Sequence, residues 1–253
     1  MRLKFLHIPK TAGTTLIERY WHNDNFCAAD REHQTPRHQV VFGHTVTTDD
    51  DPNTIYITAV RDPRERIISQ YNFVRSQLRY MNPQNPTELD FYTWFINKEV
   101  IRPMRYTGMI DWLNQANGYW NTDTSAYDTM YSNQILHWDG ETTSIEQPRL
   151  AELTERRTAV YADNYRCFKT NTHPRIHHYI DTSKDVVQEF ESLCTQYDIQ
   201  FDTVRDITRT NVTSDTLQHQ QLKYTKYTDL TPDTQQMIEQ ETHYERRFYS
   251  EVV

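Results

Sequence analysis

The sequence predicts an α/β fold, a three-layer sandwich with helices on both faces of a central, mostly parallel sheet. Two observations support this prediction. Apolar, β-rich segments alternate with helical patterns along the chain, and strands that alternate with helices form parallel sheets. Residues 54–60 (Thr-Ile-Tyr-Ile-Thr-Ala-Val) are a nearly continuous apolar run, which is typical of a strand buried on both faces. The length of 253 residues fits one domain, 1–253.

The order of the predicted elements follows from the same patterns. The predicted strands are residues 2–8, 40–46, 54–60 and 158–162. The predicted helices are residues 14–22, 63–80, 183–197 and 232–249.

Each of the three longer helices has its own signals. Pro63 suits the first turn of the helix at 63–80, whose core stripe recurs at helical spacing as Ile67, Tyr71, Val74 and Leu78. The apolar face of the helix at 183–197 consists of Val186, Val187, Phe190, Leu193, Cys194 and Tyr197. The last helix begins with Thr231 as its N-cap, a proline at the first helical position and an early acid.

Residues 81–148 are the least regular part of the sequence. Pro83 and Pro86 end the preceding helix, and tryptophans and tyrosines then stand among Asn, Thr and Asp residues. These aromatic residues could stack on sugar rings, which would make the region an acceptor-binding insertion. The alternative is that they pack into the core, where tryptophan is usually mostly buried.

Composition and charge exclude several classes of protein. With 27 basic and 35 acidic residues the net charge is −8, so nucleic acid and heavily sulfated polymers are unexpected partners. The chain has no apolar run long enough to span a membrane. Met1 leads directly into the first predicted strand, so we expect no signal peptide. Cys27, Cys167 and Cys194 are odd in number and lack Cys-x-x-Cys spacing, which predicts reduced thiols and a cytoplasmic location.

Residues 5–16 (Phe-Leu-His-Ile-Pro-Lys-Thr-Ala-Gly-Thr-Thr-Leu), here called the loop motif, predict an anion-binding site. The pattern indicates a strand, a tight loop and the start of a helix. Such an arrangement directs main-chain N–H groups, the positive end of a helix dipole and Lys10 to one point. Gly13 permits close approach of the backbone, and threonine hydroxyls add donors. The spacing differs from the Gly-x-x-x-x-Gly-Lys-Ser/Thr loop of nucleotide triphosphatases.

A second segment, residues 61–71 (Arg-Asp-Pro-Arg-Glu-Arg-Ile-Ile-Ser-Gln-Tyr), directly follows the buried strand 54–60 and is here called the arginine–serine motif. Arg61 stands at the strand end, and Ser69 follows two turns into the helix. A guanidinium group matches a phosphate geometrically, and a hydroxyl can complete the set of donors. The segment therefore predicts a second phosphate-binding position.

Together the two motifs resemble those of sulfotransferases that use 3′-phosphoadenosine-5′-phosphosulfate (PAPS), in particular the heparan sulfate 2-O and 6-O (carbohydrate) branch and its bacterial and viral relatives. The resemblance implies a P-loop-like sulfotransferase fold, PAPS as donor and adenosine 3′,5′-bisphosphate as product. It implies that the 5′-phosphosulfate is held by Pro9, Lys10, Thr11, Ala12, Gly13, Thr14 and Thr15. Arg61 and Ser69 would hold the 3′-phosphate. Asn211, in Thr-Asn-Val-Thr before a helix that ends Arg-Phe-Tyr, resembles the C-terminal signature of the family and is a further donor-binding candidate.

Three residues are candidates for catalysis. Lys10 could neutralise the departing 5′-phosphate, the alternative being a solvated lysine at a turn. His44 follows a predicted strand that ends in Gly43, at the sheet edge where α/β proteins bind ligands, and an imidazole suits proton abstraction near neutral pH. A Gly-His segment also resembles the one that carries the catalytic histidine in the 2-O and 6-O enzymes, although a structural histidine would explain it too. Glu18 is the competing base, at a spacing from Lys10 that resembles the heparan 3-O enzymes; its alternative is an acid on a helix surface.

The function predicted from these residues is transfer of a sulfuryl group from PAPS to an acceptor hydroxyl, with a carbohydrate as the expected acceptor. Two other classes remain open, a non-catalytic nucleotide- or glycan-binding protein of the same fold and a nucleotide-dependent kinase. His173 and His177 have the i,i+4 spacing of a helical metal pair, with His178 beside them, but no third ligand is evident and no metal is expected.

Overall fold

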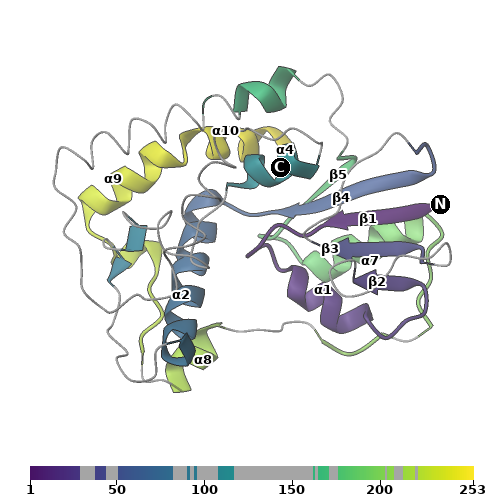
Figure 1. The fold of residues 1–253 in the computed structure, drawn as a ribbon, viewed down its shortest axis with the longest axis horizontal. Helices are drawn as coiled ribbons and strands as arrows, with labels where there is room; N and C mark the ends of the chain where they lie inside the picture. The colour runs from purple at the N-terminus through teal and green to yellow at the C-terminus, as the bar shows by residue number, and fades with distance from the viewer. Residues whose placement is uncertain are drawn as a thin grey trace.

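The chain folds around a sheet of five parallel strands in the order β2-β3-β1-β4-β5 (Figure 1). The computed structural model describes residues 1–28, 38–43, 51–81, 90–91, 94–95, 108–116, 162, 165–170, 176–202, 204–207, 213–219 and 222–253. The strands are β1 (Arg2–Leu6), β2 (Phe26–Ala28), β3 (Val40–Gly43), β4 (Thr54–Val60) and β5 (His178–Asp181). The predicted α/β class with a parallel sheet is therefore confirmed.

Helices flank this sheet and extend beyond it. They are α1 (Gly13–Tyr20), α2 (Pro63–Met81), α4 (Met109–Ala116), α7 (Val186–Gln196), α8 (Thr213–His219), α9 (Pro232–Glu241) and α10 (His243–Val252), with a 3-10 turn η1 (Tyr227–Asp229). The helices predicted at 14–22, 63–80 and 183–197 are confirmed within a few residues at each end.

Side chains alternate between the two faces of the sheet, and each face has its own core. Phe5 and Ile57 lie with Phe190 of α7 in a cluster that also includes α1 residues. On the opposite face, Tyr56 packs in a cluster with Leu113 of α4 and residues of α10. Successive residues of β4 thus enter different cores, as the period of two in a strand requires. The result is the predicted three layers.

The helix α2 leaves the carboxyl edge of the sheet and supports a third core. Ile67, Tyr71 and Val74 of α2 pack with Trp94 and with Ile238 of α9. Figure 1 shows α2, α8 and α9 beyond the carboxyl edge of the sheet. The start of α2 therefore lies where the sheet layers meet this third core.

The helix predicted at 232–249 is in fact two helices, which is a correction to the sequence prediction. Thr242 separates α9 from α10, and its hydroxyl donates to the carbonyl oxygen of Ile238 at 2.7 Å. The break lets Ile238 enter the core beside α2 while Phe248 of α10 enters the core of the sheet. Two separate cores, rather than local propensity, end the helix at this residue.

Other predicted elements were displaced or incomplete. Strands β2 and β5 were not predicted. Of the strand predicted at 158–162, residue 162 is helical and residues 158–161 lie outside the described residues. The strand predicted at 40–46 is β3, which ends at Gly43, and residues 44–46 lie outside the described residues. Within the irregular region 81–148, α4 is helical, while residues 117–148 are not described.

His177, one member of the predicted histidine pair, is not in a helix, and the other member, His173, lies outside the described residues. His177 lies directly before β5, where its Nδ1 accepts a hydrogen bond from the main-chain N–H of Tyr56 at 2.9 Å, and His178 is the first residue of the strand. Within the described ranges, no group of three or more His, Cys, Asp or Glu residues could hold a metal ion. No helix in the same ranges has both the length and the hydropathy needed to cross a membrane.

Candidate active site

The loop after β1 has an unusual backbone conformation. Lys10 has φ 68° and Ala12 has φ 61°, so two non-glycine residues lie in the left-handed region that L-residues rarely adopt. Thr11, between them, is fully buried, and its hydroxyl donates to the carbonyl oxygen of Ile8 at 2.7 Å. Strain of this kind persists only where the surroundings hold it, and it is typical of functional sites.

Gly13 is required because of the side chain of His7. A Cβ atom on Gly13 would lie 2.2 Å from Cδ2 of the His7 ring. His7 is buried, with its ring 5.2 Å from that of Phe42. The sequence predicted that Gly13 lets the backbone approach an anion, which stays a prediction; the structure gives a separate reason for glycine here, the packing of the His7 ring. The start of α1 is thus packed directly onto the end of β1.

The N-terminal end of α1 has no side-chain cap. Its N-cap is Ala12, and no acidic residue occupies its first turn. By contrast, Asp185 caps α7 by accepting from the N–H groups of Val187 and Gln188. The first N–H groups of a helix carry partial positive charge and need an acceptor. The start of α1 therefore has the geometry of an anion-binding helix terminus.

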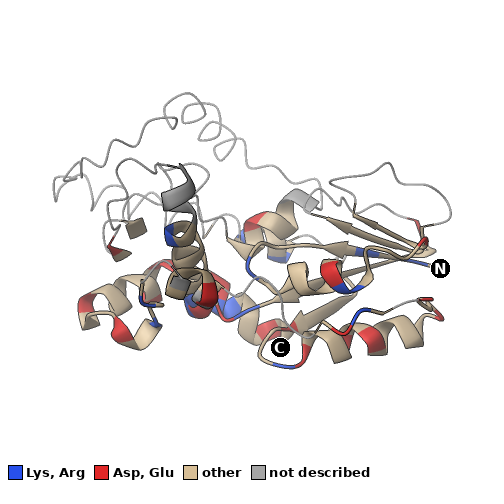
Figure 2. Cartoon of the chain, turned by 90° about the horizontal axis from the view of Figure 1, so that it is seen from below, with Lys and Arg blue, Asp and Glu red and all other residues tan. Residues whose placement is uncertain are grey.

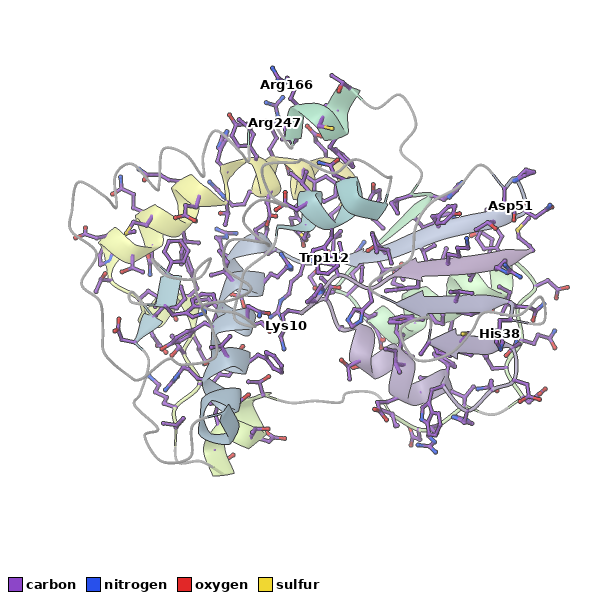
Figure 3. All side chains as sticks on the ribbon, viewed as in Figure 1. Lys10, His38, Asp51, Trp112, Arg166 and Arg247 are labelled. Atoms are coloured by element: carbon purple, nitrogen blue, oxygen red, sulfur yellow. The ribbon has the colours of Figure 1, made fainter. Side chains whose placement is uncertain are left out.

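Lys10 extends from the loop toward α2. Its ammonium group lies 4.2 Å from the ring centroid of Phe73, and Figure 3 shows the side chain between the sheet and α2. Burial, together with the positive charge of Arg61, lowers the pKa of Lys10 to about 8. No salt bridge joins Lys10 to an acid in the part of the chain that the structure describes. An anion bound here would raise the pKa of Lys10 again.

The N-terminal end of α2, unlike that of α1, is capped by a side chain. Asp62 is the N-cap, and its Oδ1 accepts from the N–H of Arg64 at 2.9 Å. The Arg64 guanidinium also donates to both carboxylate oxygens of Asp62, and it lies 3.5 Å from Glu239 of α9. Burial would raise the pKa of Asp62, but these hydrogen bonds and the charge of Arg64 outweigh it and lower the pKa below its ordinary value. Asp62 thus neutralises Arg64 locally.

Arg66 joins the two motifs, and sequence reasoning missed this role. Its side chain is almost fully buried, and Nε donates to the carbonyl oxygen of Pro9 at 3.0 Å. Arg61, in contrast, is partly exposed and pairs with Glu65 only at 3.7 Å. With Arg64 held by two acids and Arg66 bonded to the loop, Arg61 is the arginine of the motif best placed to hold a ligand anion.

Helical spacing places Ser69 on the face of α2 that contacts the loop motif. Arg66, Ser69 and Phe73 are related by steps of three and four residues, so they share one face. Arg66 contacts Pro9, and Phe73 contacts Lys10. Ser69 lies between them and is nearly buried. The structure therefore brings Lys10, Arg61 and Ser69 together at the junction of the loop and α2.

The two candidate bases are placed differently. Glu18 lies in the second turn of α1 and is half-buried. His44 follows Gly43, the last residue of β3, whose carbonyl oxygen accepts from the N–H of His7 at 2.9 Å. His44 and Asn211 both lie outside the described residues, so their roles stay predictions.

Charged residues of both signs occur along the described helices. Figure 2 shows acidic and basic residues interspersed along these described helices. This agrees with the modest excess of acids in the sequence. It favours a locally basic site over a broad polyanion-binding surface.

A model of the sulfotransferase family matches residues 2–249. The chain belongs to the sulfotransferase family. The match includes both motifs and all five strands, and family membership supports sulfuryl transfer as the reaction. A comparison with curated proteins returned no match.

Proposed function

We propose that this sulfotransferase transfers a sulfuryl group from PAPS to a hydroxyl group of a carbohydrate. The observation that carries the proposal is the junction of the two motifs, where Arg66 bonds the loop to α2 and Lys10 lies beside the helix that carries Ser69. One ligand with two anionic ends fits this arrangement better than two separate ligands.

The described residues fit such a donor. The uncapped start of α1 and Lys10 suit the 5′-phosphosulfate, with residues 10–14 as candidates to supply main-chain N–H groups. Arg61 and Ser69 suit the 3′-phosphate, because a guanidinium fork and a hydroxyl together complete a shell of donors. The capping of α2 by Asp62 supports this division, since it leaves the side chains of α2, rather than its main chain, to hold an anion.

The reaction would follow the logic of phosphoryl transfer. When bound, PAPS supplies a sulfuryl group whose bond to the 5′-phosphate oxygen breaks as the acceptor oxygen forms its own bond to sulfur. Lys10 would neutralise the negative charge that develops on the departing phosphate oxygen, which is the largest contribution that we expect from a single residue. A base would accept the proton of the acceptor hydroxyl.

We propose His44 as that base, with Glu18 as the alternative. The support for His44 is its place after β3, which pairs directly with β1, so that residue 44 follows the strand end beside the loop. Glu18 is farther along α1 from the helix terminus that would hold the anion.

Two substitutions distinguish the bases. If His44 is the base, His44→Ala abolishes transfer and leaves nucleotide affinity unchanged, while Glu18→Gln retains activity. The rate of the wild-type protein then rises with pH through a group near pH 6–7, the ordinary range of an imidazole. An inactive Glu18→Gln beside an active His44→Ala would assign the role to the carboxylate.

The acceptor class is tested by screening hydroxyl compounds with PAPS and detecting the added SO₃ by mass spectrometry. We expect neutral or weakly acidic sugars to react, because the net charge of −8 disfavours heavily sulfated polymers. The control is Lys10→Ala, which should lower the rate of the mass gain by about a hundredfold or more. Reaction with phenols or lipid headgroups alone would contradict a carbohydrate acceptor, and binding of adenosine 3′,5′-bisphosphate without any transfer would indicate a non-catalytic protein.

A further inference from the structure

Phe73 contacts the one lysine of the loop motif from a helix distant in sequence. The Lys10 ammonium lies 4.2 Å from the centroid of the Phe73 ring. This is well inside the range of about 6 Å within which a cation is attracted to the negative face of an aromatic ring. The contact is thus an electrostatic one as well as an apolar one.

The other described influences on Lys10 oppose its charge. Burial removes water from the ammonium, and the positive charge of Arg61 repels it. The acids of the arginine–serine motif are engaged elsewhere, Glu65 with Arg61 and Asp62 with Arg64. On the described elements around Lys10, the ring face is therefore the group that favours the charged form.

Both partners of this contact are held in place. The Thr11 hydroxyl donates a hydrogen bond to the carbonyl oxygen of Ile8. Arg66, two helical turns before Phe73, donates one to the carbonyl oxygen of Pro9. Phe73 itself is half-buried on α2. Because the loop and the helix are bonded to each other, the ammonium and the ring meet without ordering a mobile segment.

We propose that Phe73 is a positioning residue of this site, whose ring face holds the Lys10 ammonium between the loop and Ser69 and keeps it charged in the absence of ligand. The catalytic consequence rests on the proposed function. The effect on Lys10 itself does not, because it can be measured in the ligand-free protein.

The test is the reactivity of Lys10 toward acetic anhydride as a function of pH, followed by mass spectrometry of the peptide that carries Lys10. Only the neutral amine reacts. Phe73→Leu keeps an apolar side chain but removes the ring, so the pKa of Lys10 should fall by about half a unit, which is about a threefold rise in its reactivity at neutral pH. Phe73→Tyr keeps the ring and should restore the wild-type profile.

Two controls separate this effect from general loosening of the core. Phe91→Leu removes another ring that packs on α2, 5.0 Å from Tyr71, and should leave the Lys10 profile unchanged. Lys4, in the same protein, reports on any global change. Phe73→Met provides a second non-aromatic variant if the leucine variant does not fold.

The outcomes are distinct for the two proposals. An unchanged Lys10 profile in the non-aromatic variants, or an equal change in Phe91→Leu, would overturn the role of Phe73. A shifted profile in a protein that transfers no sulfuryl group would uphold Phe73 as a positioning residue and overturn the proposed function. In an active protein, the fall of the rate at alkaline pH should begin at lower pH in Phe73→Leu than in the wild type.

Discussion

The helices α1 and α2 begin at the same edge of the sheet, after the neighbouring strands β1 and β4, yet their N-terminal ends are built in opposite ways. The end of α1 has no side-chain cap and follows two left-handed residues. The N-terminal end of α2 is capped by Asp62, which directly precedes Pro63. The Asp62 carboxylate also neutralises the charge of Arg64.

The difference separates two ways of holding an anion. At α1 the main chain is left open, so recognition depends on backbone shape and on Lys10. At α2 the main chain is satisfied, so recognition depends on the side chains of Arg61 and Ser69. Substitutions should therefore act through charge and loop geometry at the first site, and through single ligand contacts at the second.

The largest effect is expected for Lys10→Ala. Removing a charged donor to a developing anion should cost about 3–4 kcal/mol of transition-state stabilisation, a rate loss of a hundredfold or more. The measurement is kcat at saturating PAPS, with Lys4→Ala, on the strand β1 that precedes the loop, as the matched control. Turnover within about threefold of the wild-type rate would contradict the role of Lys10.

At the second site, Arg61→Ala and Ser69→Ala should weaken adenosine 3′,5′-bisphosphate binding more than adenosine 5′-phosphate binding. Only the first ligand carries the 3′-phosphate. For Arg61 the loss should be about 2–3 kcal/mol, measured by calorimetry. Equal losses for both ligands would show that Arg61 and Ser69 do not contact the 3′-phosphate. The start of α2 would then not hold an anion through these side chains.

Exchanging residues in the loop tests whether its shape matters. Gly13→Ala places a methyl group against the buried His7 ring, so it should destabilise the fold by about 1–3 kcal/mol and weaken nucleotide binding. Ala12→Gly, one residue earlier, relieves a left-handed alanine and should be tolerated. Unfolding in urea measures both changes. Equal stability of the two variants would show that the loop is not held against His7.

The smallest effect concerns the cap of α2. Asp62→Ala should cost about 1 kcal/mol of stability, whereas Asp62→Asn keeps the cap and removes only the charge beside Arg64. Because the pKa of Asp62 is lowered in the folded protein, its charged form stabilises the fold above its unfolded pKa, and this contribution is lost as the pH falls through the folded pKa. The difference between wild type and Asp62→Asn should therefore shrink in acid; a constant difference would mean that the Arg64 pair contributes nothing.

The sequence was most informative where local chemistry decides the structure. Strand β4, helix α2 and the start of α1 follow from apolar runs, Pro63 and the loop motif. What it missed depends on tertiary contacts. The short edge strand β5 has little periodicity of its own, the break at Thr242 comes from two competing cores, and the contacts of Arg66 and Phe73 with the loop require α2 to lie against it. Arg66 could have been suspected, since it stands three residues before Ser69 and helical spacing puts the two on one face of α2.

The pairing of β1 with β4 and of β4 with β5 has a consequence for how the protein folds. The hydrogen bond between Lys4 and Tyr56 joins residues 52 apart, and that between Tyr56 and His177 joins residues 121 apart. Parallel strands with such separations pay a large loop-closure entropy before they gain contacts, so they form slowly. During synthesis, both motifs are complete once α2 has left the ribosome. The edge of β4 that pairs with β5 stays unpaired until β5 has been made. A nascent chain should thus be able to assemble its anion-binding junction while its sheet still has an open edge, which is the stage at which we expect it to be most prone to aggregate.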